Sequence, residues 1–169
     1  MNLSISPLHT DDIYDILNWN ADTGPEFLTQ WAGNGYIYPL TYEQLAKRLP
    51  PNTDSEKCRI FKILLNNDRG EKIIGTAELN THAMPKRTAM ICRYLIAPAY
   101  QNQGYGCLSL ILLSNLAFRD LGFKSLRLKV FAYNTRATRC YEKAGFSIID
   151  TRQWNDSLII HEMELNSKK

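Results

Sequence analysis

The stretch that decides the fold is residues 94–106, which read YLIAPAYQNQGYG. Its apolar start is typical of the end of a strand, which Pro98 would stop. Apolar residues then recur at helical spacing over residues 104–121, in such number that this helix is expected to be largely buried. Residues 126–130 alternate apolar and basic side chains, which is typical of a strand with one solvent-exposed face. A βαβ unit over residues 91–131 is therefore the expected centre of the fold.

The chain before residue 58 predicts one strand and two helices. Residues 2–6 alternate polar and apolar side chains, which suits a first strand. A helix capped by Thr10 or Asp11 should end before the DTGP sequence at 22–25, and a second should run from Thr41 to Pro50. Between the helices we expect a loop that either covers the core or shapes a substrate pocket. Its aromatic residues are Phe27, Trp31, Tyr36 and Tyr38.

The rest of the chain completes a mixed sheet. The turn formers NNDRG at 66–70 predict a hairpin, and Asn134 is placed to cap a last helix. These patterns predict an α/β (α+β mixed) fold with a mostly antiparallel sheet of about seven strands and about four helices. We expect one domain over residues 1–165 and a loose tail at 166–169. The remaining strands are expected at 59–65, 72–79, 88–96, 146–151 and 158–165, and the last helix at 135–143.

Composition and charge exclude several classes of partner. The chain has 169 residues, 44% of them apolar, and 20 Lys+Arg against 17 Asp+Glu leave a formal charge of +3. This balance predicts neither a nucleic-acid nor a membrane partner. The dispersed histidines and cysteines predict no metal site, and a cytoplasmic protein with reduced thiols is expected. The cysteines are Cys58, Cys92, Cys107 and Cys140.

The glycine turn at residues 101–106 suits the binding of an anion. At the start of a helix, backbone N–H groups point outward without partners, and the helix dipole adds positive potential. Glycines allow a phosphate to approach because they lack a Cβ. The turn matches neither G-x-G-x-x-G nor G-x-x-x-x-G-K-[ST], so neither dinucleotide fingerprint nor P-loop is present. Taken alone, an ordinary tight turn explains the segment equally well.

Two segments together resemble a known family. Residues 94–106 resemble the acetyl-CoA signature of the GCN5-related N-acetyltransferases (GNAT), whose core is [RQ]-x-x-G-x-[GA]. Residues 134–146, NTRATRCYEKAGF, resemble the family block N-x-x-A-x-x-x-Y-x-x-x-G-F. The resemblance covers residues 73 to about 150 and implies a GNAT-like fold whose central βαβ unit holds the cofactor. One departure is that Gln101-Asn102-Gln103 replaces the frequent Arg-Gly-Lys, which removes two positive charges beside the phosphates.

The resemblance implies acetyl-CoA as co-substrate and no metal. The pyrophosphate would bind the backbone amides of residues 103–107, the pantetheine arm would pair with residues 95–97, Asn134 would contact that arm, and Tyr141 would lie by the sulfur. The implied cofactor-binding residues are Leu95, Ile96, Ala97, Gln101, Asn102, Gln103, Gly104, Tyr105, Gly106, Cys107, Asn134 and Tyr141.

The implied reaction is acetyl transfer to a primary amine of a small molecule or a protein N-terminus, by direct attack through a tetrahedral intermediate. Tyr141 is the expected proton donor to the thiolate, and Glu78 the expected base. His82, Glu26 or water are substitutes for the base. A non-catalytic acyl-CoA-binding or regulatory module on the same fold is the alternative.

The resemblance implies an acceptor pocket built from the first two helices, their loop and the last hairpin, here residues 19–38 and 152–158. Glu26, Asp22 and Glu78 would attract a cationic amine, and Trp19, Phe27 and Trp31 would pack on its carbon chain. A protein N-terminus, a polyamine, an amino acid and an aminoglycoside all fit this expectation. The protein is expected to act as a monomer or a homodimer.

Overall fold

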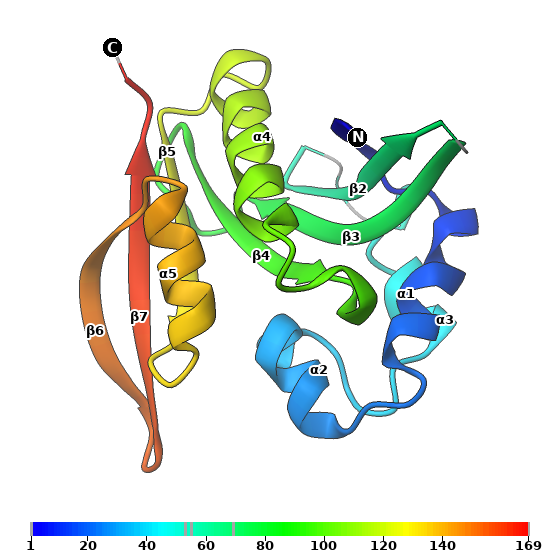
Figure 1. The fold of residues 1–169 in the computed structure, drawn as a ribbon. Coiled ribbons are helices and arrows are strands. Elements are labelled where there is room, and N and C mark those ends of the chain that lie inside the picture. Colours follow the sequence, from blue (N-terminus) through cyan, green and yellow to red (C-terminus); the bar gives the residue numbers. More distant parts are fainter. Residues whose placement is uncertain (1, 53, 55, 69, 169) are drawn as a thin grey trace.

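The computed structural model describes residues 2–52, 54, 56–68 and 70–168. Within these residues seven strands form one sheet in the order β1-β2-β3-β4-β5-β7-β6, flanked by five α-helices (Figure 1). Only β4 and β5 pair in parallel, so the expected mostly antiparallel mixed sheet is confirmed. The strands are β1 (Asn2–Pro7), β2 (Cys58–Asn67), β3 (Gly70–Asn80), β4 (Thr88–Ile96), β5 (Ser125–Phe131), β6 (Ser147–Asn155) and β7 (Leu158–Asn166). The helices are α1 (Ile13–Asn20), α2 (Pro25–Ala32), α3 (Tyr42–Ala46), α4 (Tyr105–Arg119) and α5 (Thr135–Lys143).

The helices cover the two faces of the sheet. Helices α4 and α5 lie together on one face (Figure 1), where Leu110 and Leu113 of α4 are buried in the main core. Helices α1, α2 and α3 build a second cluster on the other face. Because side chains alternate along a strand, Phe61 of β2 joins the main core while Ile60 packs against the second cluster. No described helix is long and apolar enough to cross a membrane.

Strands β4 and β5 separate after a short parallel ladder. Their pairing runs from Thr88↔Ser125 to Ile91↔Leu128 and then stops. Beyond it β4 follows β3, with Ile96 opposite Gly75, and β5 follows β7. The two halves of the sheet therefore diverge, and a gap opens between the carboxyl ends of β4 and β5.

A β-bulge sits on β4 beside this gap. Two residues of β4, Arg93 and Tyr94, oppose the single residue Ala77 of β3, and Arg93 has a positive φ of 47°. The two side chains of the bulge point to opposite faces of the sheet, as consecutive side chains of a strand do. Arg93 bonds Glu78 on the face of α1–α3, whereas Tyr94 bonds Ser109 of α4. The two residues of the bulge thus contact different layers of the fold.

The structure corrects the expected loop between the first two helices. Residues 25–32 form α2, which raises the number of α-helices in the described chain from about four to five. The reason is that Pro25 occupies the first turn of a helix, where the N–H that proline lacks would have no partner within the helix. Trp31 anchors α2, because its indole N–H donates to Asn20 Oδ1 at 3.1 Å.

The C-terminal segment is more ordered than the expected tail. Asn166 pairs with Ser125 as the last residue of β7, and the amide of Ser167 donates to the carbonyl of Lys124 at 2.9 Å. Residues 1, 53, 55 and 69 of the expected domain, the last of them in the expected hairpin turn, and residue 169 of the expected tail lie outside the described residues.

Gly75 permits the close approach of β3 to the strand that leads into the glycine turn. A Cβ at this position would lie 2.6 Å from the backbone oxygen of Leu95. We expect Gly75→Ala to lower the free energy of unfolding by about 2 kcal/mol, because a backbone atom cannot move away cheaply. Gly24→Ala is the control, since the nearest atom there, at 2.8 Å, is the end of the flexible Glu26 side chain. Equal urea midpoints for the two variants would contradict this account.

Candidate active site

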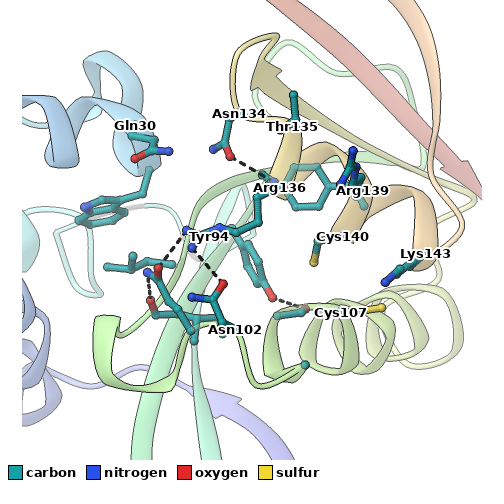
Figure 2. Close-up of a pocket in the computed structure, with 18 of the residues that line it drawn as sticks. Gln30, Tyr94, Asn102, Cys107, Asn134, Thr135, Arg136, Arg139, Cys140 and Lys143 are labelled. Carbon is teal, nitrogen blue, oxygen red and sulfur yellow. Dashed lines mark hydrogen bonds between the residues drawn. The ribbon is translucent and has the colours of Figure 1, made fainter.

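A cavity of about 440 Å³ lies where the glycine turn, the end of β4, and helices α2 and α5 meet (Figure 2). Most of the residues expected to bind the cofactor share this lining. They are Leu95, Ile96, Gln101, Asn102, Gly104, Gly106, Cys107, Asn134 and Tyr141. The other three expected residues, Ala97, Gln103 and Tyr105, are not in the lining, and the ring of Tyr105 instead packs 6.3 Å from that of Tyr100.

The glycine turn holds its backbone in a shape that suits an anion. Asn102 and Gly104 both have positive φ, 62° and 84°, so the amides around them turn toward one side. Gly104 is the N-cap of α4. The first backbone amide of the helix that bonds to a helical carbonyl is that of Leu108, which donates to Gly104 O at 3.2 Å. The amides of Gly106 and Cys107 consequently have no acceptor within the helix. Together with the helix dipole they can bind a phosphate.

Tyr94 connects this anion-binding turn, the anion cradle of residues 101–107, to β4. Its hydroxyl donates to the carbonyl of Gly106 and lies 2.7 Å from Ser109 Oγ, both in the first turns of α4. Burial raises the pKa of the Tyr94 phenol well above its usual value, so the hydroxyl stays protonated as a donor. The start of α4 is therefore fixed relative to the open edge of β4.

The open edge of β4 offers backbone groups for a ligand. The amide of Ala97 donates to Ile74 O at 2.8 Å and thus points toward β3. Because backbone groups alternate along a strand, the amide of Ile96 points the other way, into the gap. The carbonyl of Ile96 accepts from Gln101 Nε2 at 2.9 Å. An extended molecule in the gap can take the place of the missing strand at this edge.

Helix α5 contributes three cationic side chains to the cavity. None of the three was assigned a role in the site from the sequence. Arg136, Arg139 and Lys143 all line the cavity (Figure 2). Arg136 reaches the glycine turn, where Nη1 donates to Asn102 Oδ1 at 3.2 Å and Nη2 to Gln101 Oε1 at 2.9 Å. A signal was present, because the i, i+3, i+7 spacing places the three on one helix face. These cations face the turn that lacks its own.

Tyr141 and Asn134 lie where the cavity meets the gap. The Tyr141 ring stands edge-on to that of Tyr94, with centroids 6.3 Å apart. Burial raises the pKa of Tyr141 well above the ordinary value of 10.0, so its hydroxyl is protonated at neutral pH. Asn134 caps α5 as expected, since its Oδ1 accepts from the amide of Ala137 at 3.2 Å. Its Nδ2 has no hydrogen-bond acceptor in the described part of the chain.

A second cavity of about 400 Å³ lies on the other side of the gap. Its walls are residues 90–94 of β4, residues 128–131 of β5, the segment 29–35, and Trp154 and Ile160 of the last hairpin. Both cavities share one set of residues, so they adjoin where β4 and β5 diverge. This set is Gln30, Trp31, Tyr94, Asn134 and Tyr141.

Glu78 is not the exposed carboxylate that its strand position suggested. It is 0% exposed, and Oε1 accepts from Arg48 Nη2 and from Arg93 Nη1, each at 2.7 Å. Burial alone would raise the pKa of Glu78, but the two guanidinium groups outweigh it and lower the pKa. It lines neither large cavity. A carboxylate so placed is a poor base, and it acts instead as the partner that holds two buried arginines.

Only some of the residues expected to bind the substrate line a cavity. Phe27 lines the first cavity and Trp31 lines both. Glu26 lines neither, because its carboxylate folds back toward Gly24 at the start of α2. His82, the other substitute base, is also outside both linings. Among the described residues no group of three or more His, Cys, Asp or Glu side chains is arranged to hold a metal ion.

Comparison with known sequences finds one family model and several relatives. The model, described as an acetyltransferase (GNAT) domain, matches residues 2–147. The "Uncharacterized N-acetyltransferase YycN" of Bacillus subtilis (strain 168) is 24% identical over 156 residues, which span 89% of this chain and 96% of that protein. The "Uncharacterized N-acetyltransferase YdgE" of the same organism is 32% identical over 112 residues, 65% of this chain and 69% of that protein.

Solved structures share the fold over almost the whole chain. The spermidine N-acetyltransferase from Vibrio cholerae, in complex with CoA and spermine, has a TM-score of 0.79 at 19% identity, covering 97% of this chain and 95% of that one. The aminoglycoside acetyltransferase AAC(6')-Ib, in complex with coenzyme A and kanamycin, has a TM-score of 0.75 at 21% identity, covering 98% and 95%.

The ion pairs of Glu78 predict a stability effect. We expect Glu78→Gln to lower the free energy of unfolding by about 2–3 kcal/mol at pH 7, because two guanidinium groups lose their shared anion. The pKa of Glu78 is lowered on folding, so its contribution is complete above the unfolded carboxyl pKa of about 4.3 and disappears as pH falls through the folded value.

Urea unfolding between pH 7 and pH 3 measures this effect. The difference between wild type and Glu78→Gln should shrink as the pH falls below about 4. Glu71→Gln on the same strand, at an exposed residue, is the control and should change little. A pH-independent difference would mean that the Glu78 carboxylate is not what the variant loses.

Proposed function

The chain belongs to the GNAT acetyltransferase family, and we propose that it transfers the acetyl group of acetyl-CoA to a primary amine of a small molecule or a protein N-terminus. The proposed route is direct attack through a tetrahedral intermediate. One observation carries the proposal. Two cavities, one bordered by an anion cradle and one without it, adjoin at the gap between β4 and β5, where Tyr141 and Tyr94 line both.

The first cavity fits acetyl-CoA. The free amides of Gly106 and Cys107 suit the pyrophosphate, and the edge of β4 at Ile96 suits the extended arm. Arg136, Arg139 and Lys143 of α5 supply the positive charge that Gln101-Asn102-Gln103 does not. When bound, acetyl-CoA supplies a thioester whose carbonyl carbon bonds to the amine nitrogen and whose sulfur leaves as a thiolate.

The protons of the reaction need two routes. Tyr141 is the proposed donor to the leaving thiolate, and its phenol then regains a proton from solvent. The amine must enter neutral and lose one proton after attack. Because Glu78 is held by two arginines, and because Glu26 and His82 lie outside both linings, we assign this proton to water in the second cavity. The overall change is amine plus thioester to amide plus thiol.

Other features agree with an enzyme. A non-catalytic acyl-CoA-binding module would need no open acceptor cleft, whereas the second cavity has about 400 Å³, within the usual range for ligand sites. We also propose a cytoplasmic location, supported by four cysteines that are all free. A monomer or a homodimer remains the proposed state.

The role of Tyr141 predicts a kinetic effect. Tyr141→Phe should lower kcat by about 100-fold and leave the KM for acetyl-CoA nearly unchanged, because only the proton donor is lost. Release of CoA thiol with a panel of amines measures both constants. An undiminished kcat would remove the proposed role of Tyr141. If the wild type binds CoA but acetylates no amine, the binding-module alternative replaces the enzyme.

The cations of α5 predict an effect on affinity. Arg139→Ala and Lys143→Ala should each raise the Kd of CoA by about 5- to 10-fold, and the salt dependence of binding should become weaker. Titration calorimetry at two salt concentrations measures both quantities. Lys47→Ala, at the C-cap of α3 and outside both linings, is the control of equal charge change. Kd values equal to that control would show that α5 does not contact the phosphates.

A further inference from the structure

The side chains that line the second cavity include no acid. Among its described lining residues, the charged ones are Arg93 and Lys129, and none is Asp or Glu. A polyamine or an aminoglycoside carries several positive charges, which such a lining would repel. The acids that the sequence offered for a cationic acceptor do not reach it. Glu26 folds away, Asp22 lines neither cavity, and Glu78 is neutralised by Arg48 and Arg93.

Lys129 is a cation without an anionic partner. No described side chain forms a hydrogen bond or a salt bridge with its ammonium group. The acid opposite Lys129 in the β5–β7 ladder is Glu162. Its carboxylate is already bonded to Arg127 at 3.5 Å and to Arg152 at 3.3 Å. The Lys129 side chain is therefore available to pair with an anionic group of a ligand.

Lys129 also lies beside the gap, where it can contact the amine substrate that receives the acetyl group. It follows Leu128, the last residue of β5 that pairs with β4, so it lies where the gap begins. Across the gap, Cys92 follows Ile91 in the same way and lines the same cavity. A lysine side chain is long and flexible, so its ammonium can follow a small ligand toward Tyr94 and Tyr141.

The other walls of this cavity are apolar. Trp31 and Trp154 stand on different elements, and residues of β5 and β7 complete the surface. Such walls bind a hydrocarbon or aromatic body by removing it from water. The apolar wall residues outside the main core are Trp31, Met90, Phe131, Trp154 and Ile160.

We propose that the acceptor is an apolar α-amino acid whose carboxylate pairs with Lys129, whose side chain packs on the apolar walls, and whose amine is acetylated. This inference rests on the proposed acetyl transfer and names its substrate class. It sets the chain apart from the spermidine and aminoglycoside enzymes that share its fold, since likeness at 19% and 21% identity extends to the fold alone.

The experiment compares acceptors that differ in charge but not in body. Phenylalanine and phenethylamine share the aromatic side chain and amine, and only phenylalanine has the carboxylate; spermidine and kanamycin are the polycations. For each, kcat/KM with acetyl-CoA and the Kd for the CoA-saturated protein are measured. Phenylalanine should be preferred over phenethylamine by about tenfold or more in both quantities, and over both polycations.

Two variants at Lys129 test the pairing. Lys129→Met should reduce the preference for phenylalanine over phenethylamine by about tenfold, and Lys129→Glu should reverse it and improve the binding of spermidine. Lys86→Glu, an equal charge change at an exposed residue outside the cavity, should leave the preference unchanged.

The outcomes separate this inference from the proposed function. If phenylalanine binds the CoA-saturated protein through Lys129 but no acceptor is acetylated, the proposed function fails and carboxylate recognition stands. If amines are acetylated with spermidine preferred, or if Lys129→Glu behaves as Lys86→Glu does, the function stands and this inference is overturned.

Discussion

The parallel ladder between β4 and β5 stops at Ile91 and Leu128, and the rest of the structure depends on this early end. A ladder continued to Ile96 would close the sheet and leave no space for a ligand. Because it stops, β4 has a free edge, the two cavities can adjoin, and the carboxyl end of β4 leads directly into the start of α4. A free strand edge inside a protein has unpaired backbone groups. An extended ligand can pair with them.

The bulge on β4 has to be held, and a buried ion network holds it. Arg93 adopts a positive φ at the bulge, and its guanidinium bonds Glu78 together with Arg48 of the segment after α3. The ring of Tyr36 lies 5.5 Å from the Arg93 guanidinium, and Gly35 leaves the space that Arg93 fills. This network joins β3, β4 and the segment after α2 beside the second cavity. The same carboxylate cannot also serve as an accessible base.

Much of the fold could be predicted from local pattern. The bounds expected for β4 and α5, 88–96 and 135–143, match the structure, because proline, asparagine and glycine mark their ends. Helix α2 was missed because Pro25 can end one helix or begin another, and sequence alone does not choose. Most of the residues that two motifs led us to expect at the cofactor line the first cavity. The environment of Glu78 did not follow from the sequence, because Arg48 lies thirty residues away and only the folded chain brings it close. From the sequence, Lys129 is one solvent-exposed residue of a strand, and only the folded chain shows that a gap lies beside it.

The central claim is that the gap between β4 and β5 holds the co-substrate and presents it to the second cavity. A crystal structure of the protein with CoA tests it most directly. We expect the pyrophosphate within hydrogen-bonding distance of the amides of Gly106 and Cys107, the pantetheine arm paired with Ile96, and the sulfur beside Tyr141. CoA bound away from the gap, or a ladder between β4 and β5 that continues past Ile91 and Leu128, would contradict it.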